Sequence, residues 1–284
     1  MLRVVETERP APISTEVLVR VLAAGVNPVD CRTRRGEGVA RWAGPPPFVL
    51  GWDVAGVVEA MGYGVTRFAV GDLVYGMPSF PRAAGAYAEY VAAPSLHFAK
   101  APRTASPVEA AALPLAALTA WQCLVDAAGI GDGHSVVVHG ASGGVGHLAV
   151  QVAQARGARV AATRGRSDRA ALATRNADCA LDLVGGGDTS ALLDTLRSGG
   201  LLLAVADGAS DEVRRAAERR GIRVLEPLVE PDGRSLEAIA ALVDSGTLKV
   251  VVGGTYPLER AAAAHEALEA GGVRGKLVLE VGQR

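Results

Sequence analysis

The chain has 284 residues, of which 49% are hydrophobic and 21% are charged, and its formal net charge at pH 7 is −1. This length allows two domains with separate cores, and the near-neutral charge argues against nucleic acid or an anionic membrane surface as a partner. The sequence has no apolar run of about 18 residues and no signal-like N-terminus, so we expect a cytoplasmic protein. Its three cysteines are too scattered for a disulfide framework or a metal site.

The first part of the chain predicts a small β-barrel domain. Residues 16–22 alternate between apolar and polar side chains, as a half-buried strand does, and shorter strand-like pieces follow, separated by Gly and Pro. Ser106 and Pro107 are residue types preferred at the N-cap and at the first position of a helix, and a helical segment begins there. We therefore place a domain boundary after residue 105.

Residues 135–163 carry the strongest motif, a strand, a glycine turn, an amphipathic helix and a second strand. The glycines of the turn let the backbone bend sharply and let a pyrophosphate approach it closely. The N-terminus of the following helix would present N–H groups and the positive end of its dipole to that pyrophosphate. The pattern predicts a dinucleotide site formed by the residues of the turn: Ala141, Ser142, Gly143, Gly144, Val145 and Gly146.

The end of the second strand favours NADPH over NADH. An NAD site usually has Asp or Glu at this point to bind the adenosine ribose. This chain has Thr163, Arg164 and Arg166 there, and its first acidic residue is Asp168. Two guanidinium groups can bind a 2′-phosphate through charge-assisted hydrogen bonds, so we assign Thr163, Arg164 and Arg166 to the cofactor site. Because arginine is abundant in this chain, a solvated surface is the alternative reading.

Strand–helix alternation continues to about Thr247, after which the pattern changes again. Residues 250–252, a helix over residues 258–270 and a strand over residues 276–280 predict a return to the first domain. The expected division is a barrel domain of residues 1–105 and 248–284, with a dinucleotide-binding domain of residues 106–247 inserted into it.

Eight short motifs occur in one order along nearly the whole chain: GVNPVD (25–30), PFVLGWDVAGVV (47–58), VGDLV (70–74), GAYAEYV (85–91), AALPL (111–115), LTAW (118–121), ASGGVG (141–146) and RGKLVL (274–279). This set resembles the medium-chain dehydrogenase/reductase superfamily, in its zinc-free quinone oxidoreductase-like branch. The resemblance implies an α/β protein with a GroES-like β-barrel domain and a doubly wound Rossmann domain. It also implies a homodimer.

The same resemblance argues against zinc. The zinc-dependent members of the family carry Cys and His ligands in the first domain, and here Asn27 and Trp52 occupy those positions. Without a thiolate or an imidazole there is no tetrahedral zinc site and no Lewis acid for alcohol oxidation. The resemblance therefore implies zinc-independent hydride transfer from NADPH to an activated C=C, as in an enone or enoyl thioester, or to a quinone.

Four further residues are site candidates by this resemblance. Asn27 and Asp30 match a pair that lines the cleft near the nicotinamide, so we assign them a catalytic or substrate-polarising role, with an ordinary turn as the alternative. Thr119 matches a residue beside the nicotinamide carboxamide or phosphate, and a satisfied helix hydroxyl is its alternative. Lys276 is placed within reach of a cofactor phosphate, or else is a solvated lysine at a strand end.

The chain departs from the family pattern in three places. Its sequence begins with Leu2 to Glu6 where relatives usually carry a longer segment that includes a first strand. Many relatives have a Tyr shortly after the NPVD motif as a plausible proton donor, and this chain has none. Tyr63, Tyr75 and Tyr87 are substitute candidates, although each also suits a packing role.

The third departure is a compressed segment after the second Rossmann strand. We count five strand candidates where relatives have six: residues 135–139, 158–162, 179–184, 200–206 and 222–226. The missing strand is the third, an edge of the sheet. Because crossovers are right-handed, the short helix near residues 169–175 must then lie on the face opposite the 144–156 helix. We expect an open adenine end and weaker NADPH binding than in full-length relatives.

Two other functions remain alternatives. A lyase, dehydratase or cyclase on the same scaffold would need no redox step, and the missing Tyr and the deleted strand favour it. A catalytically silent binding protein is the third possibility. The intact glycine turn and the Arg164–Arg166 pair favour the reductase over both.

Overall fold

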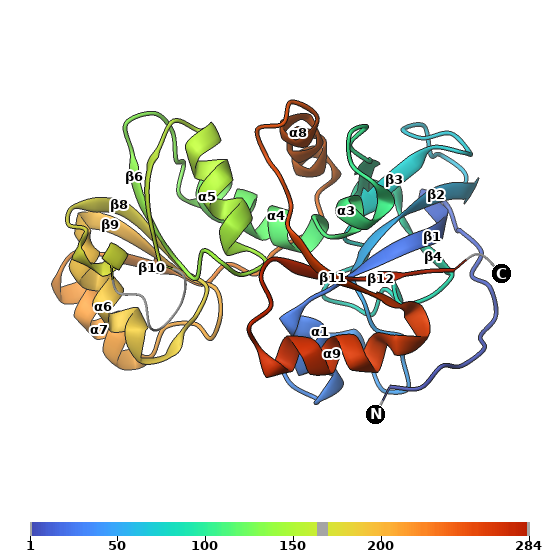
Figure 1. Ribbon diagram of the computed structural model, residues 1–284, viewed down its shortest axis with the longest axis horizontal. Coiled ribbons are helices and arrows are strands. Elements are labelled where there is room, and N and C mark those ends of the chain that lie inside the picture. Colours follow the sequence, from blue (N-terminus) through green and yellow to red (C-terminus); the bar gives the residue numbers. More distant parts are fainter. Residues whose placement is uncertain (1, 164–169, 283–284) are drawn as a thin grey trace. The chain divides into compact units, whose positions relative to one another are not determined.

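A computed structural model of the chain describes residues 2–163 and 170–282 (Figure 1). Internal contacts divide the chain into two compact units. The first unit comprises residues 1–118, 230–246 and 250–284, and the second comprises residues 119–229 and 247–249. Compared with the division predicted from the sequence, residues 106–118 and 230–246 lie in the first unit, and residues 248–249 lie in the second. No helix in the described ranges has the length and apolar character needed to cross a bilayer.

The first unit is built on a seven-stranded sheet in the order β11-β12-β1-β2-β3-β5, with β4 paired to β1. Its long central strand is antiparallel to β2, β4 and β12. Alternating residues of the predicted strand at 16–22, among them Val17, Val19 and Val21, enter the apolar core, as the period-two pattern requires. The strands are β1 (Glu16–Val26), β2 (Asp53–Met61), β3 (Leu73–Gly76), β4 (Tyr90–Pro94), β5 (Phe98–Lys100), β11 (Val252–Pro257) and β12 (Lys276–Glu280).

The last strand, β12, confirms the expected return of the chain to the first domain. Its residues 277–280 pair with residues 23–26 of β1. Helix α9 packs on β11 and β12. Helix α3 begins at the predicted N-cap Ser106, whose hydroxyl accepts a hydrogen bond from the Glu109 N–H. The helices of this unit are α1 (Pro28–Arg34), α2 (Ala40–Ala43), α3 (Pro107–Ala111), α8 (Gly233–Asp244) and α9 (Ala261–Ala270), and α4 (Pro114–Trp121) runs from the first unit into the second.

The second unit contains the predicted five-stranded parallel sheet, in the order β10-β9-β8-β6-β7. The strands lie where the sequence places them, to within a few residues at either end. They are β6 (Ser135–His139), β7 (Arg159–Thr163), β8 (Ala177–Asp182), β9 (Leu196–Ala204) and β10 (Arg223–Leu225). Its helices are α5 (Gly146–Ala155), α6 (Thr189–Leu192) and α7 (Asp211–Arg219).

The compressed segment behaves as expected from the missing third strand. Strand β7 is the edge of the sheet, and a single 3-10 turn over residues 170–173 precedes β8 within the described part of the segment. Leu172 of this turn packs into the apolar cluster that includes Leu192 and Val213, which are residues of α6 and α7. Figure 1 shows α5 on the other face of the sheet. The described part of the connection from β7 to β8 therefore lies on the predicted face of the sheet.

Candidate active site

A buried ammonium group organises the polar centre of the first unit. Lys276 on β12 is 3% exposed, and its Nζ donates hydrogen bonds to Oδ1 of Asn27 and, over 3.2 Å, to Oδ2 of Asp53. The same Asp53 oxygen accepts a 2.9 Å hydrogen bond from Nδ2 of Asn27. The other carboxylate oxygen of Asp53, Oδ1, accepts a 2.7 Å hydrogen bond from the Leu115 N–H. All polar atoms of the Lys276–Asp53 pair thus lie in a closed network, as a buried ion pair requires.

Asp30 adds a second buried carboxyl group to this centre. It lies in the first turn of α1, and its Oδ2 accepts a 2.7 Å hydrogen bond from the Asn27 N–H. Its Oδ1 has no partner in hydrogen-bond geometry among the described residues. Burial, together with the negative charge of Asp53, raises the pKa of Asp30 from 3.8 to about 7, against the opposing effects of the Asn27 N–H, Lys276 and Tyr87.

Charge balance contributes to the raised pKa of Asp30. The centre holds two carboxyl groups and one ammonium group, and Lys276 is in direct contact with Asp53. A second unpaired carboxylate in this enclosed place would be costly, so neutralisation by a proton is favoured. A carboxyl group with a pKa near 7 can hold or release a proton at neutral pH.

The close approach of these residues depends on a glycine. At Gly25, a Cβ atom would lie 2.5 Å from the Ala111 carbonyl oxygen and 2.8 Å from the Cβ of Asp53. Strand pairing between Gly25 and Asp53 brings β1 and β2 together there. Pro28 follows Asn27 at the first position of α1, where its fixed φ suits the helix start. The GVNPVD motif thus sets both the close contact and the helix that carries Asp30.

The position expected to be a zinc ligand in related proteins is occupied by an indole. Trp52 is fully buried, donates from Nε1 to the Arg82 carbonyl oxygen over 2.7 Å, and packs edge-on against Phe80. An indole N–H is a donor only and cannot bind a metal through a lone pair. No group of three or more His, Cys, Asp or Glu side chains that could hold a metal ion occurs within residues 2–163 and 170–282. The donor set found there does not fit zinc.

Of the three tyrosines considered as proton donors, only Tyr87 lies near Asp30. Tyr63 is 90% exposed. Tyr75 is buried, and its hydroxyl donates to the Leu236 carbonyl oxygen over 2.6 Å, which suits a packing role. The Tyr87 hydroxyl faces Asp30 and also forms a 3.1 Å hydrogen bond with Nε2 of His265. The sequence analysis identifies neither His265 nor Asp53 as a site residue. For Asp53 a signal was available, because this acidic residue directly follows Trp52, which occupies the position of a zinc ligand in related proteins.

In the second unit, the glycine turn links β6 to α5 as predicted. Gly140 has φ +95°, a conformation that favours glycine. At Gly146, the first residue of α5, a Cβ atom would lie 2.1 Å from the Gly140 carbonyl oxygen and 2.7 Å from the Cα of Ala141. Residues 141–145 are half-buried and precede the N-terminus of a ten-residue helix. This geometry fits the pyrophosphate of a dinucleotide.

The other predicted cofactor residues have different surroundings. Thr163 is fully buried, and its Oγ1 lies 2.7 Å from Nδ1 of His139. Its carbonyl oxygen accepts hydrogen bonds from the N–H groups of Gly140 and Ala141, so Thr163 stabilises the start of the glycine turn. Thr119 is buried on α4. Arg164 and Arg166 lie outside the described residues. Lys276 is buried in the first unit with Asp53 as its carboxylate partner, and its contact with a cofactor phosphate stays a prediction.

Replacing Asp30 by Asn is expected to flatten the pH dependence of stability. An acid whose pKa is raised in the folded state binds more protons folded than unfolded between its two pKa values, so stability falls as pH rises through this window. With a folded pKa of about 7, the parent chain should lose about 2 kcal/mol of unfolding free energy between pH 5 and pH 7 through this group. Urea unfolding at the two pH values measures the difference. An equal loss in Asp30→Asn would contradict the assignment.

Comparison with known proteins places these features in one family. Residues 132–279 match the family described as "Zinc-binding dehydrogenase", and residues 14–103 match the "Alcohol dehydrogenase GroES-like domain". The quinone oxidoreductase of Rattus norvegicus is 31% identical over 302 residues, covering 95% of this chain and 90% of the relative. The 2-methylene-furan-3-one reductase of Solanum lycopersicum is 34% identical over 283 residues, covering 93% of this chain and 71% of the relative.

Solved structures agree with the sequence relatives. The quinone oxidoreductase from Coxiella burnetii superimposes with a TM-score of 0.89 at 32% identity, covering 98% of this chain and 94% of that one. A mycobacterial protein solved in complex with NADPH gives a TM-score of 0.83 at 29% identity, covering 97% and 94% of the two chains. With the GroES-like sheet, the Rossmann sheet and the glycine turn in place, the chain belongs to the medium-chain dehydrogenase/reductase superfamily and is an oxidoreductase similar to its quinone oxidoreductases.

Proposed function

We propose that the chain is an NADPH-dependent reductase that transfers hydride to an activated C=C, as in an enone or enoyl thioester, or to a quinone, without zinc. The observation that carries this proposal is the glycine turn, in which only glycine fits at Gly146. The similarity to quinone oxidoreductases and to a reductase named for an exocyclic enone supports the class of substrate. Asn27 and the Trp52 indole supply neither a thiolate nor an imidazole, which supports a zinc-independent reaction.

The bound cofactor would supply the hydride, and the chain would supply the binding groups. In the second unit, residues 141–146 would hold the pyrophosphate through backbone N–H groups, with Thr163 fixing the turn. Thr119 and the side chains of Arg164 and Arg166 are the other proposed cofactor contacts. These residues would position the nicotinamide and its nucleotide, and the reaction would require one proton in addition to the hydride.

Asn27 and Asp30 are the proposed catalytic pair of the first unit. Burial raises the pKa of Asp30 to about 7, so this group suits the proton-donating half of a reduction. Lys276 and Asp53 hold both ends of the Asn27 amide, which fixes its direction. The alternative of a lyase or dehydratase on this scaffold is not favoured, because the relatives described above are named as oxidoreductases.

The reductase proposal is tested by following the near-ultraviolet absorbance of NADPH with three acceptors: a quinone, an enone and an enoyl thioester. Oxidation of NADPH with at least one acceptor, unchanged by a chelator, is the expected result. The Asp30→Asn variant should retain NADPH binding and lose rate. Binding of NADPH with no turnover of any acceptor would support the non-redox alternative, and no binding at all would overturn the cofactor assignment.

Cofactor choice provides a second test. Replacing Arg164 and Arg166 together by Ala should weaken NADPH binding by about tenfold or more, because charge-assisted contacts to the 2′-phosphate are lost, and should leave NADH binding unchanged. Arg159→Ala is the matched control, since Arg159 is exposed at the start of the same strand. Titration by fluorescence measures both cofactors. Equal affinities of the parent protein for NADPH and NADH would contradict the assignment.

A further inference from the structure

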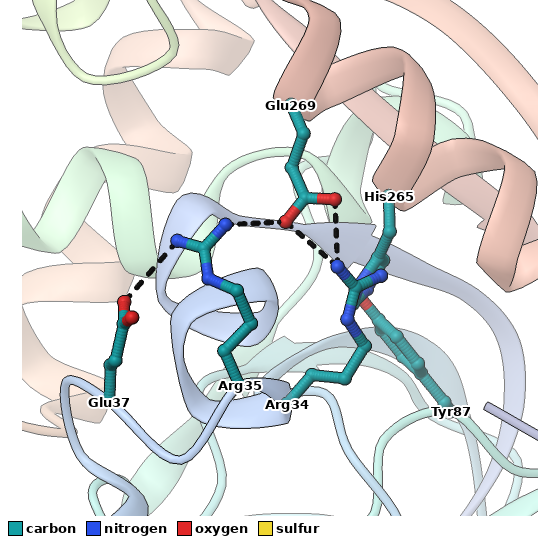
Figure 2. A network of polar contacts seen from close by, with 6 residues as sticks. All are labelled: Arg34, Arg35, Glu37, Tyr87, His265 and Glu269. Atoms are coloured by element: carbon teal, nitrogen blue, oxygen red, sulfur yellow. Dashed lines mark hydrogen bonds and ion pairs between the residues drawn. The ribbon is translucent and has the colours of Figure 1, made fainter. Parts of the chain in front are cut away.

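Tyr87 connects the buried carboxyl group of Asp30 to helix α9. Its hydroxyl lies 3.1 Å from Nε2 of His265, and the two rings meet edge-on with their centroids 5.7 Å apart (Figure 2). His265 is fully buried. On the far side of the imidazole, Nη1 of Arg34 lies 3.4 Å from Nδ1. Printed contacts thus join Arg34 to His265 and His265 to Tyr87, and the Tyr87 hydroxyl faces the carboxyl group of Asp30, all within the first unit.

The position of Tyr87 is set by its backbone neighbours. Its N–H donates to the Leu50 carbonyl oxygen over 2.9 Å. Gly51 has φ +95°, and a Cβ atom there would lie 2.3 Å from Cδ1 of the Tyr87 ring. The ring also packs against the apolar cluster that contains Ala264 of α9 and Leu277 of β12. Tyr87 therefore reaches His265 and Asp30 from a fixed place.

The contact with Arg34 determines the tautomer of His265. A guanidinium group has only donors, so Nδ1 facing Arg34 must be the accepting nitrogen of a neutral imidazole, and Nε2 must carry the hydrogen. Burial and the charge of Arg34 lower the pKa of His265 from 6.5 to about 4, against the opposing effect of Glu269, so the ring is neutral at pH 7. Glu269 holds Arg34 in place through two hydrogen bonds of 2.8 and 2.7 Å.

The tautomer of His265 in turn fixes the hydroxyl of Tyr87. Nε2–H donates to the Tyr87 oxygen, which leaves the proton of that hydroxyl for another acceptor. The acceptor it faces is Asp30, whose Oδ1 is buried and without a partner in hydrogen-bond geometry among the described residues. An unsatisfied carboxylate oxygen in a buried place is costly, and a hydroxyl donor reduces that cost.

We propose that Arg34, His265 and Tyr87 form a hydrogen-bond chain of fixed direction that turns the Tyr87 hydroxyl proton toward Asp30 and so sets how readily Asp30 is protonated. The three are positioning residues that act on Asp30, and their effect on a reaction rests on the proposed function. Besides Tyr87, the groups that face Asp30 are the Asn27 N–H and Lys276, which favour its ionised form, and Asp53, which opposes it. His265 is faced by Arg34 and Glu269.

The chain direction is tested by nitrogen NMR of the ligand-free full-length protein, which distinguishes the two imidazole tautomers. The sequence has five histidines, and the signals lost in His265→Gln identify those of His265. We expect the Nε2–H tautomer in the parent protein. Arg34→Met should populate the Nδ1–H tautomer. Arg35→Met is the matched control, because Arg35 also binds Glu269, over 2.8 Å, from the next position of the chain. A parent protein with Nδ1–H would overturn the proposal.

The effect on Asp30 is tested by carboxyl-carbon NMR titration, again without cofactor or substrate. Tyr87→Phe keeps the ring and removes the donor, so it should raise the pKa of Asp30 by about one, a tenfold change in its protonation equilibrium. His265→Gln should leave the pKa unchanged, since a glutamine amide can accept from Arg34 and donate to Tyr87. An unchanged or lower pKa in Tyr87→Phe would overturn the proposal, whether or not the protein reduces any acceptor.

If the proposed reductase activity is found, the same variants have a kinetic signature. The pH profile of kcat/KM should move to higher pH in Tyr87→Phe and Arg34→Met. It should not move in His265→Gln and Arg35→Met. Thermal unfolding of each variant checks that it is folded. Failure of the reductase proposal would remove this profile and leave both titrations intact, so the two proposals can fail separately.

Discussion

The Gly146→Ala variant should bind NADPH at least a hundredfold more weakly than the parent protein and should be less stable by about 1–3 kcal/mol. The added methyl group would lie 2.1 Å from the Gly140 carbonyl oxygen and 2.7 Å from the Cα of Ala141. Both are backbone atoms, so the turn itself must move, and the N-terminus of α5 moves with it. The N–H groups proposed to hold the pyrophosphate are then displaced. Fluorescence titration with NADPH and urea unfolding measure the two effects.

Gly143→Ala is the matched control within the same turn. A Cβ atom at Gly143 would have its nearest contact at 3.4 Å, from the same Gly140 carbonyl oxygen, which is an ordinary distance. This variant should keep most of its stability. If Gly146→Ala bound NADPH as well as Gly143→Ala does, the turn would not be the dinucleotide site, and the cofactor proposal would lose its main support.

The Rossmann sheet could be predicted from sequence because its signals are local. The valines of residues 136–138 and the glycines that follow them mark β6 and the turn within one short segment. The missing strand was visible as a lack of residues between β7 and β8, and the handedness of crossovers then fixed the side on which Leu172 packs. Local pattern and a general rule of topology were sufficient.

The polar centre of the first unit could be predicted only in part, because it joins residues far apart in the chain. Asn27 and Asp30 lie in one motif, whereas Lys276 is 249 positions from Asn27, and its sequence context suggests either a phosphate contact or a solvated lysine. A lysine at a strand end looks the same in sequence whether it is solvated or buried. Its burial follows from the pairing of β12 with β1, which no local pattern specifies.

The contacts of His265 were beyond sequence reasoning for a related reason. His265 lies on α9, in an alanine-rich segment where a histidine has no distinguishing neighbours. Its role depends on its contacts with Arg34 and Tyr87, which belong to segments far away in the chain. Likewise, α8 belongs to the first unit through its packing on β5, although strand–helix alternation placed it with the second.

Replacement of Lys276 by Met should lower the unfolding free energy by about 3–5 kcal/mol, the largest stability change that we expect from any single side chain described here. Lys276 supplies the only ammonium group in contact with Asp53 and Asn27 among the described residues. Methionine fills similar space and removes the charge, so Asp53 stays buried with its two neutral N–H donors, from Asn27 and Leu115, and no counter-ion. Urea unfolding at pH 7 measures the loss.

Two further variants separate the buried charge from the loss of a lysine as such. Lys100 pairs with Asp72 over 3.0 Å at the surface, where its side chain is 64% exposed, and Lys100→Met should cost less than about 1 kcal/mol. Adding Asp53→Asn to Lys276→Met removes the uncompensated carboxylate and should recover much of the lost stability, so the two substitutions should be strongly non-additive. If Lys276→Met cost no more than Lys100→Met, the ammonium group would not be the counter-ion of Asp53.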